Sequence, residues 1–132
     1  MSQYGAGLLI FRPSDGKVLL TRRSPFESSP GYWDFTGGGV EEGETELEAA
    51  LREGREELGG LPRLKVGTEP YWWAPSPFFA FAHFLAEMDA SGDGWEPVLN
   101  DEHDLYGWFS PKQLPTPILE GAAAGARFFF RP

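Results

Sequence analysis

Two short apolar segments open the chain, separated by residues that favour a turn. They run from Gly5 to Phe11 and from Lys17 to Arg22, with Pro-Ser-Asp-Gly at residues 13–16 between them. Proline and glycine supply the backbone dihedral angles that a tight reversal needs, so the pattern predicts a hairpin of two strands. The stretch from Ser24 to Gly31, rich in Ser, Pro and Gly, predicts a loop.

The apolar period becomes helical in the middle of the chain. Three leucines recur at spacings of four and seven residues and share one helical face: Leu47, Leu51 and Leu58. Thr45 followed by Glu48 has the form of a capping box, so a helix should begin there. The Gly59-Gly60 pair predicts its end.

Strand-type segments return after this helix. They cover residues 64–66, 71–73, 78–88 and 105–109, with prolines at 75 and 77 before the third and a surface loop at 90–100. A short helix is expected after Ser110-Pro111 and a final one from Ile118 to Phe130. No repeat or linker divides the chain, so residues 1–132 are expected to form a single domain. Strands around one strong helix predict an α/β (or α+β) domain with a mixed sheet.

The charge balance narrows the classes of partner. The chain has 11 Lys and Arg against 20 Asp and Glu, a formal net charge of −9. Nucleic-acid polymers are bound through clustered basic residues, so we expect no such partner. A small phosphorylated substrate fits, because divalent cations held by carboxylates would reverse the local charge.

Without cysteines the chain has neither disulfides nor thiolate metal ligands, and this leaves the redox compartment open. Hydropathy bears on the location of the protein. No apolar stretch approaches the roughly 20 residues that cross a bilayer. The residues at the start, MSQYGAGLLIF, contain no basic region ahead of their apolar run. We therefore expect a cytoplasmic protein that does not enter a membrane.

The predicted helix gathers negative charge on one face. Glu53, Glu56 and Glu57 share this face, nearly opposite the leucines. Like charges three and four residues apart destabilise a helix, so something must compensate. Mg²⁺ is a good candidate because it prefers oxygen ligands and shares its shell with phosphates. Ala49 and Ala50 are expected to leave room for such a ligand.

The segment from Gly38 to Gly60 resembles the Nudix box. All seven fixed positions of that pattern are present: Gly38, Glu44, Arg52, Glu53, Glu56, Glu57 and Gly59. The segment departs from the family at Gly54 and Gly60, where aliphatic side chains are usual. Gly54 should cost the helix roughly 1 kcal/mol relative to alanine. The resemblance implies the Nudix fold, an α/β/α sandwich with a mixed sheet.

The resemblance also implies the metal ligands. Glu56 and Glu57 would bind Mg²⁺ or Mn²⁺, and a backbone carbonyl near Gly38 would complete the shell. Glu53 would be either a further ligand or the base that deprotonates the attacking water. Arg52 would orient Glu44 or Glu53, and Glu102, in a late acidic loop, would supply one more catalytic carboxylate.

Residues for substrate binding are less narrowly defined by the sequence. Arg22 or Arg23, at the end of the second strand, could hold a phosphate, or they could simply end an exposed strand. Trp72 and Trp73 could stack on a base, since every base offers a π-face. Aromatic residues of this kind also pack in cores, and one of the pair should face out of its strand.

The family resemblance implies a pyrophosphohydrolase acting on a nucleoside diphosphate linked to another moiety. Nucleoside triphosphates, dinucleoside polyphosphates and nucleotide sugars all belong to this class. The alternative is a Nudix-fold domain that senses a ligand without catalysis, although the intact charged positions argue against it. Isomerases with the same fold use a catalytic cysteine, which this chain does not have. A homodimer is compatible with the sequence.

Overall fold

The computed structural model describes residues 3–131, so residues 1, 2 and 132 of the predicted domain lie outside the described part. Eight strands in these residues form one sheet. They are β1 (Gln3–Arg12), β2 (Lys17–Arg23), β3 (Trp33–Asp34), β4 (Thr36–Gly39), β5 (Leu64–Val66), β6 (Tyr71–Ser76), β7 (Phe79–Met88) and β8 (His103–Phe109). The helices are α1 (Glu46–Leu58) and α2 (Glu120–Phe129), with a 3-10 turn at Ala90–Gly92.

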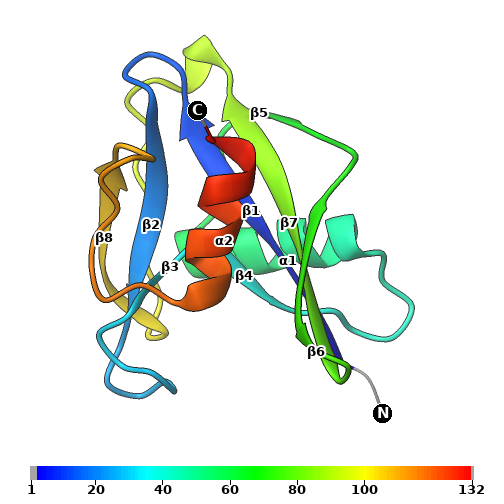
Figure 1. The fold of residues 1–132 in the computed structure, drawn as a ribbon. Helices are drawn as coiled ribbons and strands as arrows, with labels where there is room; N and C mark the ends of the chain where they lie inside the picture. Colours follow the sequence, from blue (N-terminus) through cyan, green and yellow to red (C-terminus); the bar gives the residue numbers. More distant parts are fainter. Residues whose placement is uncertain (1–2, 132) are drawn as a thin grey trace.

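Strand β1 lies at the centre of the sheet (Figure 1). One of its edges runs parallel to β7. The other edge is shared, because β4 pairs with the first half of β1 and β2 pairs with its last two residues, both antiparallel. Strands β3 and β8 continue the sheet from β2, and β5 and β6 from β7. One parallel pairing among antiparallel ones makes the sheet mixed, which confirms the predicted fold class.

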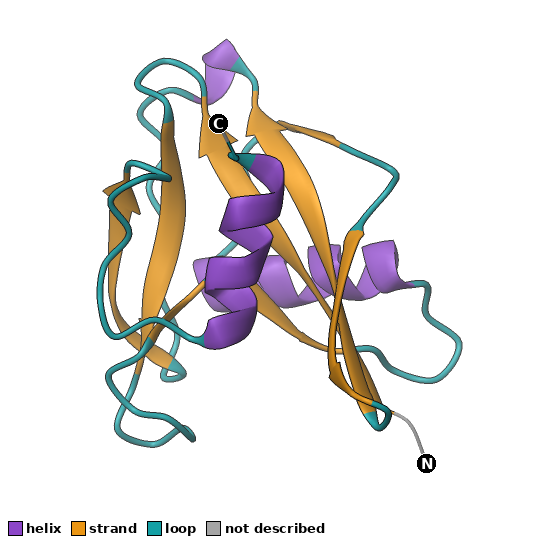
Figure 2. Cartoon of the chain, viewed as in Figure 1, coloured by secondary structure: helices purple, strands orange, loops and turns teal. Residues whose placement is uncertain are grey.

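The two helices cover opposite faces of the sheet, and each closes its own apolar core (Figure 2). Alternate residues of β1 point to the two sides, as expected for a strand buried on both faces. Leu8 and Ile10 pack on the α1 side, whereas Leu9 packs on the α2 side. The structure is therefore an α/β/α sandwich, and the ends of its central strands lie between the two helices.

Helix α1 begins and ends as the sequence predicts. The Thr45 hydroxyl accepts a hydrogen bond from the Glu48 amide at 3.1 Å, and the Glu48 carboxylate accepts one from the Thr45 amide at 2.8 Å. Gly59 ends the helix with a φ of 70°, and Gly60 follows with a φ of 115°. Both backbone conformations favour glycine, which explains why an aliphatic residue is missing at Gly60.

The space beside Gly54, the glycine inside α1, is filled by side chains from outside the helix. A Cβ atom at Gly54 would lie 3.2 Å from a Leu61 methyl group and 3.3 Å from a Leu8 methyl group. Leu61 and Leu8 therefore occupy the space that a side chain at Gly54 would take. The helix loses the propensity of a better helix former, but the core has no void at this position.

Two local predictions are wrong. Residues after Ser110 form turns instead of a short helix, because closely spaced prolines at 111, 115 and 117 interrupt any helical ladder. Ala49 and Ala50 are fully buried in the core on the α1 side, so they leave no room for a ligand. No helix in residues 3–131 combines the length and apolar character that crossing a bilayer requires.

Candidate metal and substrate site

Arg52 fixes the acidic face of α1 to the loop ahead of it. Its guanidinium donates two hydrogen bonds to the Glu44 carboxylate, at 2.7 and 3.1 Å, and one to Glu53 at 3.0 Å. A further bond at 2.9 Å reaches the carbonyl of Gly39. The bidentate pairing lowers the pKa of Glu44 and keeps that carboxylate ionised. Arg52 therefore holds Glu53 against the backbone of β4.

Gly38 makes this approach possible. A Cβ atom at Gly38 would lie 2.7 Å from either carboxylate oxygen of Glu53, which is closer than real Cβ contacts allow. Only glycine lets the Glu53 carboxylate rest on the strand at this point. Gly38, the first residue of the segment that resembles the Nudix box, thus has a steric role: it leaves room for the Glu53 side chain of α1.

Glu57 is the most buried carboxylate of α1. Only 2% of its surface is exposed, and its Oε1 accepts hydrogen bonds from the Thr36 hydroxyl at 2.7 Å and the Gly37 amide at 3.1 Å. Burial raises the pKa of Glu57 to about 8, and the nearby carboxylates of Glu102 and Glu53 act in the same direction. The two hydrogen bonds oppose this shift without offsetting it, so this carboxylate has no adequate countercharge.

These groups line a cavity of about 350 Å³, which we call the acidic cavity. Its lining contains six carboxylates, those of Glu27, Asp34, Glu53, Glu56, Glu57 and Glu102, together with the backbone of residues 37–39. The lining also contains Arg23 and His103, and burial lowers the pKa of His103, so Arg23 is the lining residue with a permanent positive charge. The cavity therefore has an excess of negative charge and oxygen ligands that a hard divalent cation would offset.

Asn100 joins the late loop to the end of α1 and also holds Glu102 within that loop. The Asn100 side-chain amide donates to the carbonyl of Glu56 at 3.1 Å, and the Asn100 side-chain oxygen accepts from the amide of Glu102 at 2.9 Å. Partial burial, followed by the charges of Glu53 and Glu27, raises the pKa of Glu102. The structure thus brings Glu102 beside the glutamates of the box.

The acidic cavity fits a divalent metal ion in its donor chemistry. Glu53, Glu56 and Glu57 would hold such an ion, with the Gly38 carbonyl as a backbone donor. In residues 3–131, however, no three His, Asp or Glu side chains are gathered closely enough to hold an ion as they stand. Glu53 is held by Arg52, Glu57 is turned onto β4, and the Glu56 side chain is 54% exposed. Side-chain rotations would bring these carboxylates together.

A second cavity lies on the α2 side of the sheet. We call this space of about 400 Å³ the aromatic cavity; β7 provides Phe79, Phe81 and His83, β6 provides Trp73, and the first turn of α2 closes it. Asp34 lines both the acidic and the aromatic cavity. Burial raises the pKa of Asp34 to about 7, against the effect of Arg23, although 26% of its side-chain surface is exposed. Asp34 is therefore a titratable group common to both cavities.

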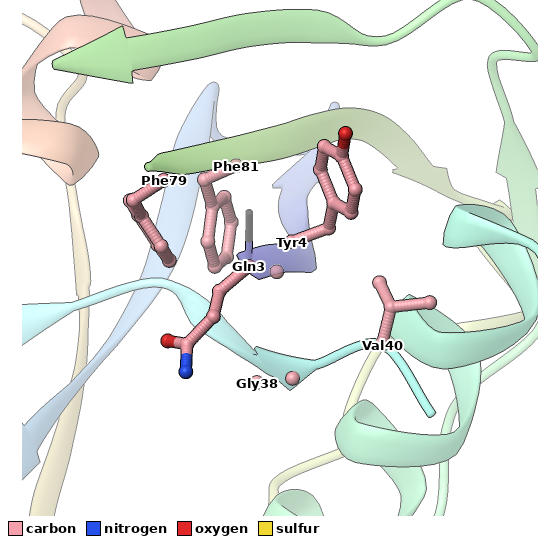
Figure 3. A pocket seen from close by; sticks show the side chains of 8 residues that line it. Gln3, Tyr4, Gly38, Val40, Phe79 and Phe81 are labelled. Atoms are coloured by element: carbon pink, nitrogen blue, oxygen red, sulfur yellow. The ribbon is translucent and has the colours of Figure 1, made fainter. Parts of the chain in front are cut away.

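A third cavity, of about 590 Å³, opens at the beginning of β1 and shares Phe79 and Phe81 with the aromatic cavity. Figure 3 shows Phe79 and Phe81 side by side, with Tyr4 and Val40 on the other side of the opening. The Phe81 ring fills the space above the glycines of β1 and β4, since a Cβ atom at Gly5 would lie 2.7 Å from it. These glycines let the ring lie flat on the sheet.

The structure separates each pair of predicted substrate-binding residues. Arg23 lines the acidic cavity, whereas Arg22 lines neither cavity and donates a hydrogen bond to Asp104 at 2.9 Å. Trp73 lines the aromatic cavity. Trp72, which is 42% exposed, points away from it and packs edge-on against Tyr4. Neighbouring residues of a strand alternate between faces, which explains why one member of each pair is directed elsewhere.

The cavity residues that the sequence analysis did not identify include Glu27, Asp34 and His83. Glu27 lies in a loop whose composition indicates only a turn. Asp34 stands between Trp33 and Phe35, and His83 stands between apolar residues of β7; a polar residue in such an apolar run is the signal that could have identified them.

Comparisons with known proteins agree with this geometry. The sequence model of the NUDIX domain matches residues 1–131. A nucleoside triphosphatase NudI from Escherichia coli is 49% identical over 112 residues, which cover 76% of this chain and 78% of the relative. A CTP pyrophosphohydrolase from Escherichia coli is 49% identical over only 45 residues, 34% of this chain and 33% of that protein.

A solved structure extends the likeness to the fold. The crystal structure of a MutT NUDIX hydrolase from Burkholderia pseudomallei superimposes with a TM-score of 0.75 at 27% identity, and covers 96% of this chain and 97% of that one. The predicted family is thereby confirmed. With a family match over nearly its whole length and the fold to accompany it, the chain belongs to the Nudix family of pyrophosphohydrolases.

Proposed function

We propose that this protein hydrolyses the diphosphate linkage of a nucleoside diphosphate derivative with the help of Mg²⁺ or Mn²⁺. The observation that carries the proposal is the acidic cavity, where six carboxylates face one arginine beside the backbone of β4. Carboxyl groups crowded in this way resist ionisation, as the raised pKa values of Glu57 and Glu102 indicate, and a bound cation would stabilise their ionised forms and attract a phosphate. Nucleoside triphosphates, dinucleoside polyphosphates and nucleotide sugars are the candidate substrates.

The residues of the cavity divide into groups that bind and groups that position. Glu53, Glu56, Glu57 and the Gly38 carbonyl would hold the cation, which, once bound, neutralises charge on the diphosphate and lowers the pKa of a water molecule. Arg52 keeps Glu53 in place through its bonds to Glu44 and β4.

Two carboxylates are candidates for the base that takes the proton of the attacking water. Burial and nearby carboxylates raise the pKa of Glu102, so it accepts a proton more readily than an ordinary glutamate, and Glu53 is the alternative. Arg23 is the basic residue placed to contact a phosphate oxygen.

The test is a panel of nucleotides incubated with Mg²⁺ or with Mn²⁺, with products separated by chromatography. We expect cleavage between two phosphorus atoms, abolished by chelation and reduced at least a hundredfold in Glu57→Gln. Mn²⁺ binding followed by calorimetry should weaken in the same variant. Glu42→Gln is the matched control, because Glu42 is exposed and does not line the acidic cavity.

The alternative, a domain that binds a ligand without catalysis, predicts a different result. A wild-type protein that binds Mn²⁺ and nucleotide but turns over no member of the panel would support that alternative. Turnover that Glu57→Gln leaves unchanged would refute the assignment of the acidic cavity.

A further inference from the structure

Thr36 of β4 is a polar residue in a position where packing alone favours an apolar one. It lies between Phe35 and Gly37 and is only 4% exposed. Valine has nearly the same volume and would avoid the cost of burying a hydroxyl group. The Thr36 hydroxyl has a partner, because it donates a hydrogen bond of 2.7 Å to Oε1 of Glu57. This contact with Glu57 is the feature that distinguishes threonine from valine here.

The backbone of β4 holds the Thr36 hydroxyl in place. Thr36 pairs with Leu8 of β1, and Gly37 pairs with Gly7. A Cβ atom at Gly7 would collide with the Thr36 carbonyl oxygen, so the two strands are in close contact at this point. Threonine is branched at Cβ, which restricts its χ1 rotamers. The hydroxyl therefore has little freedom to move away from Glu57.

The two oxygens of the Glu57 carboxylate have different surroundings. Oε1 accepts from the Thr36 hydroxyl and also from the Gly37 amide at 3.1 Å, so both of its lone pairs are used. Among the described residues, no donor forms a hydrogen bond with Oε2. Glu57 lines the acidic cavity. Oε2 is therefore the oxygen that remains for a cation.

The number of oxygens that a carboxylate offers affects which cation it binds best. Ca²⁺ takes about six to eight oxygen ligands and often uses both oxygens of one carboxylate. Mg²⁺ is smaller and requires a near-ideal octahedral shell, and Mn²⁺ also accepts six oxygen ligands. A carboxylate with one oxygen already saturated suits the octahedral ions and is a poor bidentate ligand for Ca²⁺.

We propose that Thr36 is a positioning residue for the cation: its hydroxyl keeps Oε1 of Glu57 on β4, so that Glu57 offers only Oε2 and the acidic cavity favours Mg²⁺ or Mn²⁺ over Ca²⁺. This inference rests on the proposed function, since it concerns the cation that the acidic cavity would hold. Thr36 does not line that cavity, so it acts through Glu57. Removal of a group that orients a metal ligand typically lowers metal affinity about 10- to 100-fold.

The test compares cation binding by the wild type and two variants of Thr36. Thr36→Val removes the hydroxyl and keeps the branched shape, whereas Thr36→Ser keeps the hydroxyl. Mn²⁺ binding is followed by electron paramagnetic resonance, and Ca²⁺ binding by competition with Mn²⁺. We expect the Kd for Mn²⁺ to rise about tenfold in Thr36→Val, and the Kd for Ca²⁺ to change much less because the freed Oε1 can join Oε2 as a ligand. Thr36→Ser should keep the wild-type preference for Mn²⁺.

A matched control separates positioning from stability. Thr21 of β2 is also buried, at 1% exposed, but its hydroxyl lies 3.5 Å from the carbonyl oxygen of Asp34 and contacts no glutamate of α1. Thr21→Val should leave both Kd values unchanged, whatever its effect on Tm. Thr36→Ala replaces the valine variant if that protein shows no cooperative melting. An equal loss of Mn²⁺ and Ca²⁺ binding in Thr36→Val, or a fall in Tm with both Kd values unchanged, would show that Thr36 is only structural.

Measurements on the wild type separate this inference from the proposed function. A wild type that binds Ca²⁺ as tightly as Mn²⁺ would overturn the inference alone. A wild type that binds no Mn²⁺ would refute the assignment of the acidic cavity, and the inference with it. If Mn²⁺ binding responds to the Thr36 variants as expected but no nucleotide is hydrolysed, the inference holds and only the proposed hydrolysis fails.

Discussion

The buried carboxylate of Glu57 should make the metal-free protein less stable as the pH rises. Its unfolded-state pKa is 4.5, and burial raises the folded-state value to about 8. Between these values the folded chain holds a proton that the unfolded chain has released. The folded state therefore binds more protons, and the free energy of unfolding falls with increasing pH in this window. The stabilisation is complete below pH 4.5 and is lost by about pH 8.

The magnitude follows from the two pKa values. A difference between 4.5 and about 8 corresponds to about 5 kcal/mol, since one pKa unit is worth about 1.4 kcal/mol. Glu57 is 2% exposed, so solvent screening takes little from this value. Glu57→Gln removes the titration but keeps an oxygen that can accept from Thr36 and Gly37. The free energy of unfolding of the variant should equal that of the wild type near pH 4.5 and should be several kcal/mol larger near pH 8.

The assay is denaturant unfolding in the presence of a chelator at intervals from pH 4.5 to pH 9. Subtracting the wild-type curve from that of Glu57→Gln cancels groups that do not interact with Glu57, such as His83, whose pKa also changes on folding; the difference reports Glu57 together with the neighbouring carboxylates of Glu53 and Glu102. Adding Mg²⁺ should stabilise the wild type far more at pH 8 than at pH 5, because metal binding needs the ionised carboxylate. Parallel curves for the two proteins would refute the reasoning.

Three further predictions concern glycine and arginine positions. Gly38→Ala should remove most activity while circular dichroism stays unchanged, because its Cβ would displace the Glu53 carboxylate. Arg52→Lys should lower kcat roughly 10- to 100-fold, since lysine cannot pair with Glu44 and hold Glu53 at the same time; Mn²⁺ affinity should fall in parallel. Gly60→Ala should lower the free energy of unfolding by about 1 kcal/mol, measured in denaturant, because alanine is strained at a φ of 115°.

Features set by residues close in sequence could be predicted well. The capping box at Thr45, the glycine end of α1 and the common face of the three box glutamates all depend on spacings within a few turns of one helix. The extended β1 and β7 strands were also expected from their apolar runs. Local periodicity thus located the side chains that hold the cation in the proposed function.

Features that depend on distant segments could not be predicted in the same way. Asp34 and His83 are 49 positions apart, and their strands β3 and β7 come around one cavity because β7 pairs with one edge of β1 while β2, which carries β3, pairs with the other. Ala49 and Ala50 look open on an isolated helix, but the sheet covers them. Whether Arg22 or Arg23 faces the cavity depends on the irregular register between β2 and β8 at that point.

The position of Asp34 between two cavities has a consequence for how new activities could arise on this scaffold. In the proposed function, the phosphates lie in the acidic cavity beside α1 and β4, whereas the aromatic cavity is lined by β6, β7 and α2. Substitutions in the second set can alter which molecules are accepted while leaving the bond-breaking apparatus intact. Natural selection can therefore change which group attached to the diphosphate is accepted, while the residues that would cleave the diphosphate stay the same.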